Sequence, residues 1–333
     1  MPRLIAARVF QFLIVLWLVA TFTFFLIRII PGDPVDILVP TRRLPGSVAA
    51  ERAKEVRHDL GLDKSLPAQY VNYLGQLASF DLGKDYGSGR PVTDTLKTAL
   101  PVSLQLMLYA QILALAFAIP LGVFTAYRAG SRADRGLNAT AFGFLAMPNF
   151  VLGLLLSFIV GAKLKWLPSV GYTPGWLDQI FDSSRHMDLG PHIRSMILPS
   201  VTLAVGQIAI YMRLLRSDMI ATLQENFITM ARSKGISDRR ILWRHALRPS
   251  SITLLTVAGL NVGTLIGGAV VIEVIFNLGG MGKAIVFALN QKQYVTLQSL
   301  ILVLAALFVL VNFLVDALYT FVDPRIRRAR AAA

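Results

Sequence analysis

Long apolar stretches are the feature that most restricts how this chain can fold. The first runs from Val9 to Ile30 and is interrupted only by Gln11, a few threonines and Arg28. A helix of about 20 apolar residues is long enough to cross the hydrocarbon core of a membrane. Further runs of this kind cover residues 102–127, 139–160, 197–215, 250–272 and 297–322. The sequence therefore predicts an all-α, polytopic membrane protein with six transmembrane helices.

Composition agrees with this prediction. Only 16% of the 333 residues are charged, whereas about a quarter of the residues of an average soluble protein are. The run 197–215 is the weakest candidate span, because it is short and contains Gln207 and Arg213. Cysteine is absent, which excludes disulfides and thiolate metal sites.

The distribution of Lys and Arg predicts the orientation of the spans. Basic residues are concentrated in the segments that would share a side with the N-terminus, above all residues 226–250 and the tail 324–333. Residues 31–97 contain equal numbers of acidic and basic residues. Because cytoplasmic loops are rich in Lys and Arg, we expect both termini to be cytoplasmic. These loops then account for the formal charge of +14, and we expect no binding of nucleic acid.

The spans divide the chain into four expected parts. Residues 1–30 form a short tail and the first transmembrane helix, and residues 31–97 form an extracytoplasmic segment. Within that segment we expect helices at 48–60 and 67–80, which together make a small cap or scoop. Residues 98–323 form the core with five transmembrane helices, and residues 324–333 form a cytoplasmic tail.

A compact basic element, NFITMARSKGISDRRILWRHALRPS at 226–250, interrupts the apolar runs. Lys234 followed by Gly235 is typical of a helix C-terminus, and Ser237 can cap a second helix at about 238–247. We expect Pro249 to end this second helix and to start the fifth span. The first helix should continue the fourth span, with one apolar stripe formed by Leu215, Met219, Leu223, Phe227 and Ala231.

Three interpretations of this element compete. It could be an interfacial helix held by anionic membrane lipid, a DNA-binding helix-turn-helix, or a docking element for a cytoplasmic motor. Lipid binding explains the charge but not the glycine-hinged helix pair with its own apolar face. DNA binding is disfavoured because both ends of the element are tied to membrane spans.

The element resembles the signature cytoplasmic loop of bacterial ABC importer permeases. That loop reads Glu-Ala-Ala, three residues, Gly, nine residues, Ile, one residue and Leu-Pro. Gly235 matches the glycine, Ala231 the second alanine and Leu247 the leucine, whereas Pro249 falls one place beyond the proline. Thr229, Met230 and His245 depart from the pattern in ways that resemble its dipeptide/oligopeptide branch. The order of further motifs also resembles that branch, namely RIIPGDP at 28–34, LGLDK at 60–64, ILP at 197–199 and DPRIR at 323–327.

The resemblance implies a type I importer permease fold and a set of partners. The chain would be a permease of the bacterial inner membrane that pairs with a second, homologous permease, two cytoplasmic ATPase subunits and an extracytoplasmic substrate-binding protein. A coupling helix at about 234–248 would sit in a groove of one ATPase and move the spans by alternating access. The residues implied in coupling are Ala231, Lys234, Gly235, Ile236, Ser237, Arg240 and Leu247. The cargo would be a dipeptide, a longer peptide, a glutathione-like molecule or a nickel chelate.

The chain itself does not carry the nucleotide chemistry. Residues 279–284 (GGMGKA) look like half of a phosphate-binding loop, but Asn277 and Ala284 stand where the pattern needs Gly and Ser or Thr. A turn before an outer helix at 281–293 is the better interpretation. We therefore expect no catalytic residue and no cofactor in this chain, with ATP and Mg²⁺ bound by the partner ATPases.

Polar residues inside spans are candidates for the transport path. Gln207 in the fourth span and Asn261 in the fifth are as well explained by pore lining as by interhelical hydrogen bonding. The histidines show no ligand spacing, so no metal site is expected, and His186 and His192 are assigned to a solvated outer loop. Two rival functions remain open: an ion channel or secondary carrier with a lipid-bound basic helix, and an intramembrane enzyme.

Overall fold

The computed structural model describes residues 2–29, 35, 46–59, 63–85 and 89–322. These residues form helices and connecting loops without a β-strand, apart from a single antiparallel bridge between Lys84 and Pro91. The motif at 28–34, most of the one at 60–64 and the tail 324–333 lie largely or wholly outside the described residues. Packing divides the chain into two units, one of Met1–Leu100 with Gly280–Val309 and one of Pro101–Gly279 with Leu310–Ala333.

The first unit contains the N-terminal helix and the helices of the expected outer segment. It comprises α1 (Pro2–Ile29), α3 (Gly46–Asp59), α4 (Leu66–Ala78), the start of α5 (Val92–Tyr127), α13 (Met281–Asn290) and the first part of α14 (Tyr294–Val322). The predictions of helices at 48–60, 67–80 and 281–293 are confirmed. The α4 helix packs on α1 through aromatic rings, with Phe24 stacked on Tyr73 at 5.5 Å between ring centroids. Thr21 Oγ1 and Tyr70 OH share a hydrogen bond of 2.7 Å on the same side.

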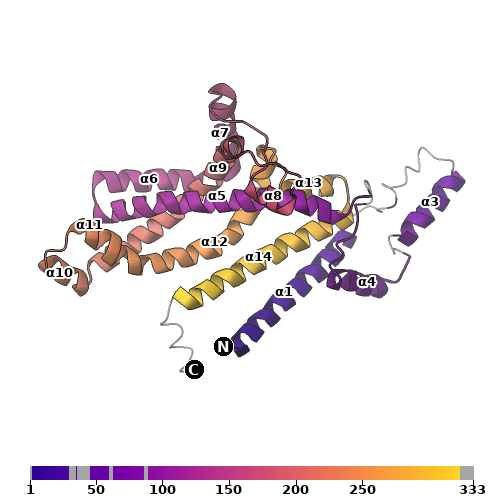
Figure 1. The fold of residues 1–333 in the computed structure, drawn as a ribbon, viewed down its shortest axis with the longest axis horizontal. Helices are drawn as coiled ribbons and strands as arrows, with labels where there is room; N and C mark the ends of the chain where they lie inside the picture. Colours follow the sequence, from indigo (N-terminus) through magenta and orange to yellow (C-terminus); the bar gives the residue numbers. More distant parts are fainter. Residues whose placement is uncertain (1, 30–34, 36–45, 60–62, 86–88, 323–333) are drawn as a thin grey trace. The chain divides into compact units, whose positions relative to one another are not determined.

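The second unit is a helical bundle around α9 (Leu189–Leu223), which packs against α12 (Leu247–Ile275), α6 (Arg132–Ala146) and α7 (Asn149–Leu156) (Figure 1). It also contains most of α5 and the last part of α14. The shorter elements of the unit are η2 (Ser157–Lys163), α8 (Trp176–Phe181), α10 (Asn226–Ser233), α11 (Asp238–Arg240) and η3 (Ile241–Ala246). The helix α9, which contains the weakest candidate span, is the most buried of the long apolar helices, with 67% of its most apolar window inside the protein. Because α9 contacts protein more than its surroundings, it needs less apolar surface than the outer helices.

Among the described residues, four helices are long and apolar enough to cross a membrane: Val92–Tyr127, Leu189–Leu223, Asp238–Ile275 and Tyr294–Val315. The run predicted as a span at 139–160 does not form one continuous helix. These residues belong to a helix pair, Arg132–Ala146 and Asn149–Lys163, that is bent by 98°. Met147 is extended there (φ −85°, ψ 125°), because the ring of Pro148 excludes the helical conformation from the residue before it. The pair could serve as a fifth, broken span, so the count of six stays a prediction.

Candidate functional site

The basic element forms a hairpin of two helices, which we call the basic hairpin (residues 226–248). The α10 helix ends at Ser233, and Gly235 adopts a left-handed conformation with φ of +73°. Gly235 N donates to Arg232 O at 2.9 Å and Ile236 N donates to Ala231 O at 3.2 Å. This pair of bonds is a Schellman motif, which satisfies the last carbonyls of a helix. The predicted glycine stop is therefore confirmed, and it fixes the angle between the two arms.

The hairpin has an apolar face that belongs to the core of the second unit. Ile228, Ile241 and Ala246 are fully buried, and Ala231 and Leu242 are nearly so. They pack in one cluster with α9 and α12 residues that includes Leu215, Met219 and Leu254, and the partly buried Ile236 and Leu247 join it. The hairpin is consequently not a loose loop, because displacing it would expose this cluster to water.

The opposite face of the hairpin is exposed and cationic. Lys234, Arg239, Arg240 and Arg244 are exposed, as is Trp243 at 48%. The residues that the resemblance implies in coupling thus separate into two groups. Ala231, Ile236 and Leu247 face the core, whereas Lys234, Gly235, Ser237 and Arg240 are exposed.

Three expectations about the hairpin are wrong. Ser237 occupies the cap position of the second arm, but its side chain makes no capping hydrogen bond. Its carbonyl does accept a bond from Ile241 N at 3.0 Å. The stripe through Phe227 is interrupted, because α9 ends at Leu223 and α10 starts only after the extended Glu225. This offset leaves Phe227 46% exposed and buries Ile228 in its place.

Pro249, the third expectation, does not end the second arm. Helical structure runs without a break from Asp238 to Ile275, through the π-turn η3 and into α12. A π-turn widens the helix by one residue per turn, and this relieves the clash that a proline ring makes with the preceding turn. The second arm of the hairpin and α12 are therefore one continuous helix.

The polar residues Gln207 and Asn261, predicted separately from two spans, meet in the structure. Asn261 Nδ2 donates to Gln207 Oε1 at 3.2 Å, and Gln207 Nε2 donates to Thr264 Oγ1 at 3.2 Å. Beside them, Tyr211 OH donates to Gln111 Oε1 at 3.3 Å. We call these five residues the polar strip. It is held by α5, α9 and α12 and keeps Gln207 and Asn261 half-buried and Thr264 exposed.

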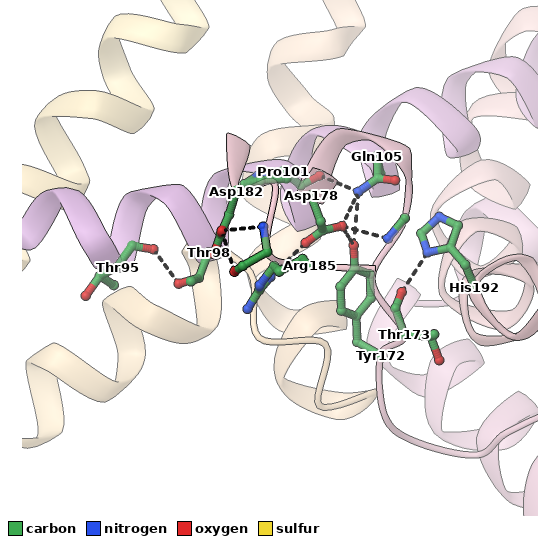
Figure 2. Close-up of polar contacts among 12 residues, drawn as sticks. Thr95, Thr98, Pro101, Gln105, Tyr172, Thr173, Asp178, Asp182, Arg185 and His192 are labelled. Carbon is green, nitrogen blue, oxygen red and sulfur yellow. Dashed lines mark hydrogen bonds and ion pairs between the residues drawn. The ribbon is translucent and has the colours of Figure 1, made fainter. Parts of the chain in front are cut away.

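A second polar cluster, which sequence reasoning missed, organises the loop between η2 and α9 (Figure 2). The carboxylate of Asp178 is fully buried. Its Oδ2 accepts hydrogen bonds from Tyr172 OH, from Gln105 Nε2 at 2.9 Å and from Gly175 N at 2.8 Å. Its Oδ1 pairs with Arg185 Nη1 at 2.8 Å. Burial and the neighbouring Asp178 raise the pKa of the Tyr172 phenol far above its usual value, so this hydroxyl stays protonated and donates.

His192 belongs to the same region and corrects the solvated-loop prediction. It is fully buried at the start of α9. Its Nδ1 lies 2.7 Å from Thr173 O and its Nε2 lies 3.0 Å from Tyr109 OH. Because a carbonyl only accepts, Nδ1 carries the proton and donates to it. The hydrogen bonds of Asp178 and His192 to Gln105 and Tyr109 fix the loop on α5.

A third polar contact lies near the end of α5, at the start of α6. Arg216 in α9 binds Asp134 with two hydrogen bonds, Nε to Oδ1 and Nη2 to Oδ2, each 2.7 Å long. Gly130 N also donates to this carboxylate, at 2.8 Å. The signal in the sequence was an arginine inside an apolar helix, which needs a partner. Within the described ranges, no group of three or more His, Cys, Asp or Glu side chains is placed to hold a metal ion.

Comparison with known proteins agrees with this architecture. The family model "Binding-protein-dependent transport system inner membrane component" matches residues 118–328, and the model of the N-terminal part of such components matches residues 1–107. The di/tripeptide transport system permease protein DppB of Pseudomonas aeruginosa is 37% identical over 94% of this chain and 95% of its own length. The oligopeptide transport system permease protein AppB of Bacillus subtilis is 35% identical, over 91% and 92%.

Among solved structures, a chain of the inward-facing MetNI methionine ABC transporter has a similar fold. The TM-score is 0.53 at 17% identity, and the match covers 69% of this chain and 96% of that one. At this identity the match concerns the fold alone. Together with the family models and the relatives, it leads to one conclusion: the chain belongs to the inner membrane components of binding-protein-dependent transport systems, the permease subunits of ABC importers.

Proposed function

We propose that this permease moves peptides or peptide-like solutes into the cytoplasm, driven by ATP hydrolysis in separate subunits. The named functions of relatives that align over nearly the whole chain support a cargo of the peptide class. A second permease, two ATPase subunits and an extracytoplasmic binding protein complete the assembly. Both termini and the basic hairpin face the cytoplasm, as the Lys/Arg bias favours.

The observation that carries the proposal is the mechanical connection of the basic hairpin. One arm continues into α12 without a break, and the Schellman motif at Gly235 fixes the other arm against it. The buried face packs into the same cluster as α9 and α12. A force applied to the exposed face therefore moves two membrane helices together, because close-packed interiors transmit displacement.

In the proposed cycle, the exposed residues Lys234, Ser237 and Arg240 contact a groove of one ATPase. Ala231, Ile236 and Leu247 hold the hairpin to the bundle and pass the motion on. Closure of the ATPase pair on ATP turns the pathway outward to receive cargo from the binding protein, and hydrolysis returns it inward. Gln207 and Asn261 line this pathway, which their half-buried position supports.

The test is the assembly of the purified permeases with their ATPase subunits. We expect Arg240→Glu to weaken assembly or to uncouple ATPase activity from transport, because it reverses the charge of the docking face. Arg132→Glu is the matched control, since Arg132 is also exposed but lies at the start of α6, outside the hairpin. Unchanged assembly and coupling in Arg240→Glu would argue against the docking role.

The same assay separates this proposal from the rival functions. A secondary carrier or channel would transport in proteoliposomes without any ATPase subunit, and substitutions on the hairpin surface would leave its rate unchanged. An intramembrane enzyme would turn over substrate as an isolated chain. The unbroken connection of the hairpin to α12 supports neither the carrier or channel nor the enzyme. A basic helix that only binds lipid does not need a rigid connection to a membrane helix.

A further inference from the structure

An open cleft of 490 Å³ lies at the end of α9 that leads to the basic hairpin. We call it the arginine cleft. Ile210, Leu214 and Val257 form its apolar wall, and its polar lining consists of Asn138, Arg213, Arg216 and Ser217. Arg213 and Ser217 share one face of α9 with Ile210 and Leu214. Its volume falls in the range of small-molecule sites, about 300–1,000 Å³.

The arginine cleft continues the polar strip along the same helix faces. On α9, Gln207, Ile210 and Leu214 are spaced by three and four residues and so share one face. On α12, Val257 and Asn261 share a face for the same reason. Arg213 is six residues beyond Gln207, about 9 Å further along the axis. A solute that leaves the polar strip in this direction reaches the cleft next.

The two arginines of the cleft differ in their charge balance. Arg216 is neutralised by Asp134, with two hydrogen bonds of 2.7 Å. The guanidinium of Arg213 lies over the ring of Phe142, 4.1 Å from its centroid. In the described part of the chain, no carboxylate lies within ion-pair distance of Arg213. Stacking on the ring holds the guanidinium plane and leaves its N–H edge available to bind a carboxylate with two hydrogen bonds.

We propose that the arginine cleft is an exit subsite that binds a carboxylate of the cargo, with Arg213 as its cation. The inference rests on the proposed function and adds to it a preference for solutes with a free carboxylate. Ser217 supplies a further hydrogen-bond donor in the cleft. One uncompensated arginine matches a singly charged group, and the apolar wall accommodates the adjoining part of the solute.

An anionic lipid is the other ligand to which an arginine beside an apolar wall is suited. The position of the wall argues against it, because Val257 lies on the face of α12 that carries Asn261. Leu255, which is 49% exposed, lies two residues away and therefore on nearly the opposite side of the helix. On α12 the cleft thus shares its face with the polar strip and not with Leu255.

The test measures binding of radiolabelled trialanine to the assembled importer in nanodiscs, without nucleotide and without binding protein. Trialanine amide is the competitor that lacks the carboxylate. We expect Arg213→Gln to weaken trialanine binding at least about tenfold, the loss typical for a charged hydrogen-bonded pair. The amide should compete poorly against trialanine in the wild type but as well as unlabelled trialanine in the variant. Arg213→Lys should restore part of the affinity.

Arg128→Gln is the matched control, because Arg128 also lies over a phenylalanine, 5.8 Å from the centroid of Phe124, but does not line the cleft. We expect the Arg128→Gln variant to bind trialanine as tightly as the wild type does. The proposal is overturned by equal losses in both variants, by equal competition from the amide in the wild type, or by no binding to the wild type. Competition in the wild type decides the question even if Arg213→Gln assembles poorly.

Two further readouts separate the possible causes of failure. Nanodiscs of phosphatidylcholine alone and with phosphatidylglycerol distinguish the lipid alternative. Retention of phosphatidylglycerol by the wild type but not by Arg213→Gln, with loss of trialanine binding in that lipid, would make the cleft a lipid site. ATP-driven uptake of trialanine with the binding protein present tests the proposed function itself. Uptake that needs ATP but shows no change of carboxylate preference in Arg213→Gln would overturn only the exit subsite.

Discussion

Arg216 and Asp134 join two elements that are far apart in the sequence through two parallel hydrogen bonds of 2.7 Å. The carboxylate is almost completely buried and also accepts from Gly130 N and Asn138 Nδ2. The pair ties the turn after α5 and the start of α6 to the central helix α9. It also removes one of the two positive charges of the arginine cleft.

Loss of this pair should destabilise the second unit. Asp134→Asn leaves the guanidinium of Arg216 largely buried without its counter-ion, which costs about 3 kcal/mol. Thermal unfolding of the purified chain in detergent measures the change. Asp188→Asn is the control, since Asp188 is exposed and its side chain makes no capping bond; its stability should change by less than about 0.5 kcal/mol. Equal stability of the two variants would refute the structural role of the pair.

Gly175 should not tolerate a side chain. Its φ of −111° is ordinary, so any cost is steric: a Cβ at this position would overlap Gln105 Oε1 and the ring of His192. Gly175→Ala should lower stability by about 1–3 kcal/mol and detach the loop from α5. Limited proteolysis of the loop, together with thermal unfolding, measures both effects.

The substitution Gly190→Ala should change the stability in the opposite direction. Gly190 lies in the first turn of α9 and a Cβ there meets nothing within 4 Å. Alanine should therefore stabilise the helix, by up to about 1 kcal/mol. Destabilisation by both substitutions would show that crowding around Gly175 is not the cause.

The backbone conformation of Gly235 gives a third prediction. A Cβ at this position meets no atom within 4 Å, so substitution costs only the left-handed conformation at φ of +73°. Gly235→Ala should destabilise the hairpin by about 1 kcal/mol, and Gly235→Asn by less, because asparagine tolerates this region better. Hydrogen exchange of the amides in α10 reports the change. Equal protection of glycine, alanine and asparagine variants would contradict the Schellman geometry.

The bond between Asn261 and Gln207 gives a fourth prediction. In a double-mutant cycle with Gln207→Leu and Asn261→Leu, we expect a coupling energy of about 0.6 kcal/mol, the average for hydrogen bonds between membrane helices. Unfolding of the single and double variants in detergent provides the four free energies. The control cycle combines Gln207→Leu with Thr140→Val, because Thr140 Oγ1 donates to Gly136 O in its own helix. A coupling energy no larger than that of the control cycle would show that the side chains of Gln207 and Asn261 are not in contact.

Local patterns in the sequence predicted much of the helical structure. The apolar runs mark where four long helices lie, and Lys234-Gly235 marks the end of α10. These signals act over one or two turns of a single segment, so they can be found without knowing the neighbours. The same locality explains why the bend within 139–160 was not foreseen: apolar composition continues through Pro148 although the helix pair is bent by 98°.

The candidate sites depended on relations between segments. Periodicity placed Gln207 and Asn261 on their helices but could not show that the two side chains meet. The apolar stripe on α9 lost its register at Glu225, and a buried Ile228 replaced Phe227. Asp178 and His192 appeared to belong to a polar loop, because hydrophilic composition does not reveal that a loop folds onto α5.

The amino-acid sequence by itself determined that this chain is an all-helical membrane protein, where its long helices run, and that a glycine-hinged basic hairpin interrupts them. These properties follow from apolar length, charge and backbone preference, which each residue carries independently of its distant neighbours. Only the tertiary structure decided that Arg216 neutralises Asp134 while Arg213 keeps its charge, and that the second arm of the hairpin continues into α12. Those outcomes depend on distances between side chains from different helices, and packing alone sets such distances.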